Sequence, residues 1–151
     1  MINLEKALIV IDASNLLLGR LASITAKQLL QGKSVTIINS EKAVISGSRR
    51  SILEAAQQHL RTKTHGSQSK APKHPRRPEG ILRRAVRGML PYNEPRGKTA
   101  YRRLKVYLDV PENLAAGSAM TLPDAKASKG TVGLTISEVA QNIGWNALQE
   151  K

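Results

Sequence analysis

The sequence predicts an α/β protein with a mainly parallel sheet of about four strands and a basic extended arm. Two almost continuous apolar runs, residues 7–12 and 34–39, are typical of strands buried in a parallel sheet. Between them, apolar residues recur at helical spacing, so the first 39 residues are expected to form a βαβ unit. A later stretch, residues 62–78, is rich in proline and cations and is expected to be extended.

The helix of the expected βαβ unit should begin after Asp12. Asp12, Ser14 and Asn15 offer side-chain oxygens that can cap its N-terminus. Its end is indicated by Gly32, which suits the left-handed residue that follows many helices. The residues spaced along one buried face are Leu18, Leu21, Ala22, Thr25 and Leu29.

A second helix is expected after a short turn at residues 39–41, with Ser48 as its cap. Arg49 and Arg50 fall in its first turn, where the helix dipole disfavours positive charge. An external phosphate would compensate these two cations. The side chains expected to point inward are Ile52, Leu53, Ala56 and Leu60.

A basic helix follows the arm, beginning near Pro78 and ending at Pro91. Its expected apolar stripe consists of Leu82, Ala85, Val86 and Met89. Three arginines, Arg83, Arg84 and Arg87, lie within an arc of roughly 100° on the helix.

The remainder of the chain predicts fewer elements. A basic loop is expected at residues 92–103, and a third strand at 104–110. Residues 111–130 are loop-like, and 131–135 fit a short strand. A last helix should begin at Ser137, with Val139, Ala140 and Ile143 on its apolar face.

The charge distribution predicts a polyanionic partner. The net charge is +13, and it divides into +2 for residues 1–48, +13 for 49–105 and −2 for 106–151. Concentration of the excess in the middle third favours nucleic-acid binding over a solubilising charge. Arginine is suited to this role because its planar fork matches phosphate. With three tyrosines, one tryptophan and no phenylalanine, recognition by phosphate position and shape is expected rather than base stacking.

The residues alone already indicate which side chains should contact the nucleic acid. The first are Arg83, Arg84 and Arg87, which share one helix face. The surrounding cations in sequence are Arg49, Arg50, Lys70, Lys73, Arg76, Arg77, Arg96, Lys98, Arg102 and Arg103.

Enzymatic chemistry is not predicted. Two phosphate-loop-like segments, residues 32–34 and 97–99, lack the required earlier glycine. The three histidines have no common metal-ligand spacing, there is no cysteine, and Asp12 is better explained as a helix cap than as an acid–base group. We therefore expect no catalytic residue, metal or cofactor. No signal peptide or membrane span is indicated, so a cytoplasmic protein without a membrane partner is expected.

Three segments resemble the universal large-subunit ribosomal protein family L-thirteen. The first is Val10-Ile11-Asp12-Ala13 with Leu18-Gly19-Arg20-Leu21-Ala22-Ser23, and the second is residues 38–47. The most specific is Val86-Arg87-Gly88-Met89-Leu90-Pro91, followed by Gly97 and then Leu104-Lys105-Val106-Tyr107. Direct passage from Gly32-Lys33 into the second strand resembles the archaeal and eukaryotic branch.

The resemblance implies a three-layer α/β/α fold in a single domain, residues 1–151, with a basic RNA-binding insertion at about 62–103. It implies a structural role in the large ribosomal subunit, with ribosomal RNA and neighbouring ribosomal proteins as partners and no small-molecule substrate. By the same resemblance, the RNA-contacting residues are Arg83, Arg84, Arg87, Gly88, Met89, Arg96, Gly97 and Lys98. Two alternatives remain: a small nucleotide-binding enzyme, and a free-standing RNA-binding regulator of translation.

Overall fold

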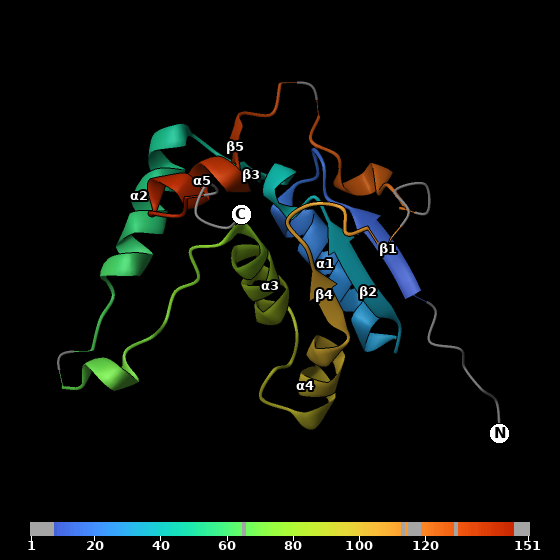
Figure 1. Ribbon diagram of the computed structural model, residues 1–151, viewed down its shortest axis with the longest axis horizontal. Coiled ribbons are helices and arrows are strands. Elements are labelled where there is room, and N and C mark those ends of the chain that lie inside the picture. The colour runs from blue at the N-terminus through green and yellow to red at the C-terminus, as the bar shows by residue number, and fades with distance from the viewer. Residues whose placement is uncertain (1–7, 65, 113, 115–118, 129, 147–151) are drawn as a thin grey trace.

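The computed structural model describes residues 8–64, 66–112, 114, 119–128 and 130–146. Within these ranges the α-helices are α1 (Leu18–Leu30), α2 (Arg49–Arg61), α3 (Pro78–Gly88), α4 (Pro95–Arg102) and α5 (Ile136–Asn142). The strands are β1 (Leu8–Asp12), β2 (Ser34–Ile38), β3 (Val44–Ser46), β4 (Leu104–Val106) and β5 (Gly133–Thr135). Short 3-10 turns occur at Ser40–Lys42, Gln68–Lys70 and Pro123–Ala125. Figure 1 shows this arrangement.

The main sheet is parallel and has the order β1-β2-β4, which confirms the predicted α/β class. Ile9 pairs with Val35, and Ile37 with Val106, so the two apolar runs of the sequence form adjacent buried strands. A fourth segment joins the free edge of β1 through a single bridge between Ile11 and Met120. The sheet therefore has three strands, and one further segment pairs with the edge of β1 at a single position.

The predicted strand at 131–135 forms β5, but it does not join the parallel sheet. It pairs antiparallel with β3, with Val44 opposite Thr135 and Ser46 opposite Gly133. A Cβ atom on Gly133 would overlap the carbonyl oxygen of Ile45, so this close pairing needs a glycine. These residues therefore do not supply a fourth strand of the main sheet, because β3, which was not predicted from the sequence, provides their partner.

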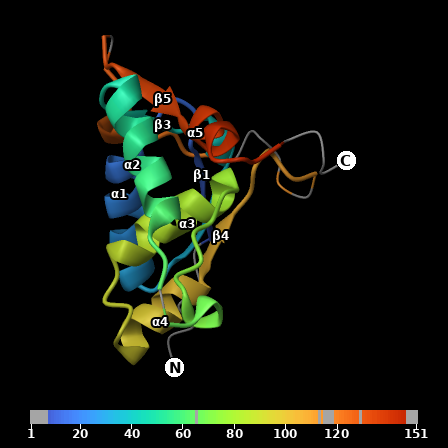
Figure 2. The same ribbon diagram turned by 90° about the vertical axis from the view of Figure 1, so that its left-hand side faces the viewer.

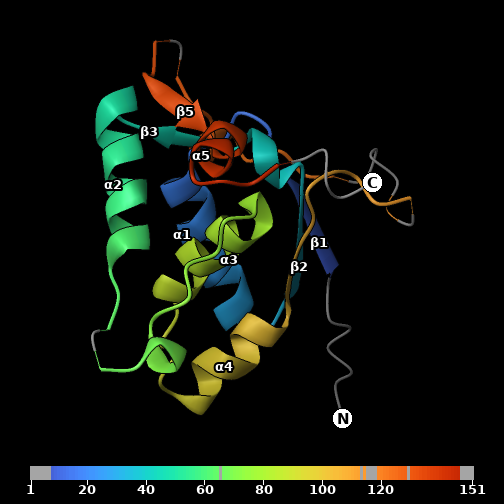
Figure 3. The ribbon, with the colours of Figure 1, turned by 60° about the vertical axis from the view of Figure 1, so that its left-hand side comes forward.

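The core lies between one face of the main sheet and the helices α1 and α3. Leu21 and Leu29 of α1 and Leu82 and Val86 of α3 are fully buried there, together with the inward side chains of the strands. Figure 3 shows both helices on the same side of the sheet. Across the opposite face, described residues after β4 run as coil toward the β1 edge, as the front of Figure 1 shows. Within the described ranges, this coil stands where the resemblance implied a second helical layer.

Two predicted helix caps are corrected by the structure. Helix α1 begins at Leu18 after Leu17, and no side chain caps it. The Asp12 carboxylate instead accepts hydrogen bonds from Ser14 and from the amide of Asn39. Helix α5 is capped by Thr135 in a reciprocal capping box with Glu138, two residues before the expected position.

The predicted Ser48 cap of α2 is confirmed, since its hydroxyl oxygen accepts a hydrogen bond from the Ser51 amide at 3.3 Å. None of the expected inward side chains, Ile52, Leu53, Ala56 and Leu60, is fully buried. Figure 2 shows α2 along the outside of the molecule, where it packs against α5 and β5.

Residues 92–103 were predicted to be a basic loop, and this was wrong. Pro95 provides a first-turn residue, and α4 runs to Arg102 with Gly97 and Ala100 buried.

Met89 was assigned to the apolar stripe of α3, but its side chain is 45% exposed. It lies just after Gly88, the last helical residue, and the next residue, Leu90, is the one that is buried in the core.

Candidate nucleic-acid interface

Helix α3 divides its side chains between the core and the surface. Leu82 and Val86 are buried against the core, and this fixes the rotation of the helix about its axis. Arg83 and Arg87, one helical turn apart, consequently point away from the core. An open groove runs beside them, between the arm, α3 and α4. Its lining residues are Pro72, Lys73, Pro75, Gly80, Arg83, Arg84, Arg87 and Tyr101.

The two outward arginines of α3 lie over two tyrosines. The guanidinium carbon of Arg83 is 5.3 Å from the centre of the Tyr101 ring, and that of Arg87 is 5.1 Å from the Tyr92 ring. The two rings meet edge to face, with their centres 5.5 Å apart. These four side chains form a continuous cluster, which we call the Arg–Tyr cluster. No role for these tyrosines was predicted from the sequence.

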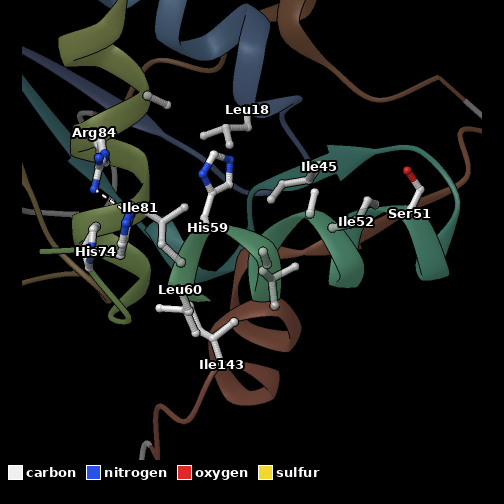
Figure 4. Close-up of a pocket in the computed structure, with 15 residues that line it drawn as sticks. Leu18, Ile45, Ser51, Ile52, His59, Leu60, His74, Ile81, Arg84 and Ile143 are labelled. Atoms are coloured by element: carbon white, nitrogen blue, oxygen red, sulfur yellow. Dashed lines mark hydrogen bonds between the residues drawn. The ribbon is translucent and has the colours of Figure 1, made fainter. Parts of the chain in front are cut away.

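Arg84 faces the arm rather than open solvent. Its Nη1 donates hydrogen bonds to the carbonyl oxygen of Lys73 at 3.1 Å and to Nδ1 of His74 at 3.2 Å. Because a guanidinium only donates, Nδ1 must accept, and the bond needs a neutral imidazole. Figure 4 shows this pair beside His59, at an apolar pocket that separates α2 from the core. Arg84 therefore ties the arm to α3.

Burial lowers the pKa of His74 below its ordinary value, and the positive charges of Arg84 and His59 lower it further. The unfolded chain then binds a proton more readily than the folded chain, so the stability that His74 contributes is present above about pH 6.5 and is lost as the pH falls toward its folded value. We expect the free energy of unfolding to fall as the pH is lowered through this range, as urea denaturation at a series of pH values would measure.

Glutamine at position 74 keeps a hydrogen-bond acceptor but cannot titrate in this range. The free energy of unfolding of His74→Gln should therefore fall less than that of the wild type over this pH range. An equal fall in this variant would show that another group is responsible.

Arg103 has a protein partner, although it was predicted to contact RNA. Its Nη2 donates a 2.7 Å hydrogen bond to the carbonyl oxygen of Leu29, and its Nε is buried. A cation at this position satisfies a carbonyl in the last turn of α1 and interacts favourably with the helix dipole. Arg103 thus has a structural role, whereas its neighbour Arg102 is exposed.

The remaining predicted cations lie in different places. Arg49 and Arg50 are at the start of α2, at the far end of the molecule from α4 in Figure 3, and Arg50 pairs with Glu54 at 2.7 Å. Arg77 pairs with Glu79 at 3.1 Å. The other predicted cations along the arm and α4 are Lys70, Lys73, Arg76, Arg96, Lys98 and Arg102.

The two glycines implied by the resemblance differ in their surroundings. A Cβ atom on Gly97 would overlap the carbonyl group of Pro91, so this glycine permits close packing within the protein. A Cβ atom on Gly88 would have no neighbour within 4 Å. Met89 and Arg96 line a second hollow together with Lys27 of α1, a cation that was not predicted to belong to the site.

Asp12 has the surroundings of a structural carboxylate. Burial raises its pKa, but hydrogen bonds from Ser14 and Asn39 and the charge of Lys42 outweigh burial, so the net pKa is lowered. In the described part of the chain, no three His, Asp or Glu side chains gather as a metal site would require. The helices of that part are also too short or too polar to cross a membrane.

The family model and the similar proteins that match this chain point to the same family. The family model described as Ribosomal protein L13 matches residues 6–113. A protein of Aeropyrum pernix is 41% identical over 95% of this chain and 94% of its own length. A protein of Methanosarcina barkeri is 46% identical over 89% of this chain and 96% of its own, and one of Archaeoglobus fulgidus is 42% identical over 92% and 89%. All three carry the name large ribosomal subunit protein uL13.

Proposed function

Because the chain belongs to the ribosomal protein L13 family, we propose that it binds large-subunit ribosomal RNA through α3, α4 and the arm. Membership makes it a structural component of the large ribosomal subunit rather than an enzyme. The archaeal relatives agree with the branch expected from the sequence. Binding would support assembly of the subunit, with ribosomal RNA and neighbouring ribosomal proteins as partners.

The observation that carries this proposal is the placement of Arg83 and Arg87 over Tyr101 and Tyr92, beside a groove that also contains Lys73. Such a surface offers several fixed phosphate-binding groups from one rigid helix. Lys98, one turn before Tyr101 on α4, adds another exposed cation. We therefore propose residues 62–103 as the RNA-binding portion. Within it, Arg84 holds the arm against α3, and Arg103 holds the end of α4 against α1.

The direct test is binding of the purified protein to a fragment of large-subunit ribosomal RNA, with a fragment of small-subunit ribosomal RNA of equal length as the control. We expect tighter binding to the large-subunit RNA and a steep fall of affinity with salt. Equal, weak binding to both would contradict the proposal. If the free protein instead bound a nucleotide while binding RNA weakly, the enzyme alternative would be favoured.

Sedimentation of the tagged protein in a lysate separates the structural role from free-standing regulation. A ribosomal component should remain with large subunits through high-salt washing. A regulator that acts away from the ribosome should be released or should sediment alone.

The arm should be the first part of the free protein to be cut by trypsin. Lys63 and Lys70 lie in a segment that has almost no apolar side chains, and its only regular structure in the described residues is one 3-10 turn. Bound RNA should slow these cuts at least about tenfold, an order-of-magnitude expectation for a segment that orders on its partner. The sites would be read by mass spectrometry. Equal resistance of the arm and the α1 region would contradict this prediction.

A further inference from the structure

The Arg–Tyr cluster has a geometry that bears on how the arginines bind. An exposed arginine on a helix normally samples many rotamers, and binding a phosphate then has an entropic cost. Here each guanidinium lies over a ring, at 5.3 Å and 5.1 Å from the ring centres. Stacking occupies the face of the guanidinium but leaves the N–H groups at its edge free to donate.

The rings are themselves held in place by the protein. Tyr101 is half-buried in α4, and its ring meets Tyr92 edge to face at 5.5 Å. The turn that contains Tyr92 lies so close to α4 that Gly97 has no room for a Cβ atom beside Pro91. The tyrosines are therefore a fixed support under two otherwise mobile cations.

We propose that Tyr92 and Tyr101 are positioning residues that hold Arg83 and Arg87 as a preformed site for two neighbouring phosphates of one RNA strand. The two arginines are one helical turn apart, about 6 Å along the axis, which is of the same order as the separation of neighbouring phosphates. In this proposal the tyrosines act through the arginines, each of which has its guanidinium over one tyrosine ring, and not by stacking on bases. This inference rests on the proposed function.

The test compares three double variants with the wild type. Tyr92→Leu with Tyr101→Leu removes the rings, and Tyr92→Phe with Tyr101→Phe keeps them without the hydroxyl groups. Arg83→Gln with Arg87→Gln removes the charges. Tyr107→Leu is a matched control, because Tyr107 has the same 37% exposure as Tyr92 but no stacked arginine among the described residues. Thermal unfolding of each variant establishes that it is folded.

Two measurements are made on each folded variant. The first is the affinity for a large-subunit ribosomal RNA fragment at several salt concentrations. The second is the order of the Arg83 and Arg87 side chains in the free protein, from relaxation of their Nε–H groups. We expect the leucine variant to bind about five to ten times more weakly and to have disordered arginine side chains, as removal of two cation–π interactions predicts. The phenylalanine variant and Tyr107→Leu should match the wild type.

Several results would overturn the inference. Wild-type affinity in the leucine variant would show that the rings do not assist binding. Weak binding with arginines that remain ordered would show that the tyrosines contact RNA directly, and equal weakening in the phenylalanine variant would assign the effect to the hydroxyl groups. Failure of the proposed function is distinguishable, because the wild type would then show no preference for large-subunit RNA. The relaxation measurement on the free protein would still test whether the two tyrosines hold the side chains of Arg83 and Arg87 in place.

Discussion

Replacement of Arg83 and Arg87 by glutamine should reduce the slope of log affinity against log salt by about 1.4 to 1.8 units, since each phosphate that a cation neutralises contributes about 0.7–0.9. Each arginine releases condensed counterions when it meets a phosphate, so the slope counts the neutralised phosphates. Glutamine retains a long polar side chain with good helix propensity, and the buried Leu82 and Val86 are unchanged. The weakening should be similar for RNA sequences of the same shape, because phosphate contacts carry little base information. Filter binding or fluorescence anisotropy over a range of salt gives the slope.

A matched control removes the same charge elsewhere. Arg20 and Lys126 are exposed, and Arg20 lies near Asp124 at the opposite end of α1 from its contact with Arg103. Changing both to glutamine should leave the slope nearly unaltered. An unchanged slope in the Arg83 and Arg87 variant would place the RNA surface elsewhere, with Arg49 and Arg50 the next cations to test.

The Gly97→Ala substitution should destabilise the protein by about 3 kcal/mol, which is typical of a backbone overlap that no side-chain rotation can relieve. The added Cβ atom would overlap both the carbonyl oxygen and the carbonyl carbon of Pro91. Either α4 or the turn before it must move, and the packing of Tyr92 against Tyr101 should be disrupted as a result. Urea denaturation gives the change in stability.

Gly88→Ala is the matched control, since this glycine belongs to the same sequence motif but has no neighbour at its Cβ position. Alanine has the higher helix propensity, so Gly88→Ala should be neutral or stabilising by up to about 1 kcal/mol. Equal stability of the two alanine variants would show that the turn at Pro91 yields easily. In that case Gly97 would not determine the position of α4.

The β1-α1-β2 unit was predictable because its apolar pattern is long and regular. Both strands and the buried residues Leu21, Ala22, Thr25 and Leu29 of α1 agree with the prediction. Helix α4 was missed because it is short and its composition is that of a basic loop. Only Gly97 and Ala100 are buried in it, so no apolar periodicity marks the helix.

The strand pairing at 133–135 was not predictable from local pattern. A three-residue strand such as β3 has too few residues to show alternation, and its partner β5 lies far away in sequence. The capping residue of α5 illustrates a smaller error. Thr135 and Ser137 are both good caps, and the glutamate three residues after Thr135 is the signal that distinguishes them.

Within the site, the basic helix was identifiable from the sequence, but surface cations could not be separated from structural ones. Arg83 and Arg84 are adjacent and chemically identical, yet one lies over Tyr101 and the other holds the arm. The difference is set by the rotation of α3 on the core. Arg103 similarly turns inward, because the end of α4 meets the last turn of α1.

The bonds from Arg84 to Lys73 and His74 divide the arm into two parts. The arm connects α2 and α3 and is therefore held at both ends by the chain itself, but these bonds also fix its C-terminal part on α3. Residues fixed in this way lose their backbone freedom when the protein folds rather than when it binds a partner. Release of Lys73 and His74 from Arg84 should therefore raise the conformational cost of binding. Insertions between Lys63 and Lys70 should change that cost only slightly, because closure entropy depends weakly on loop length.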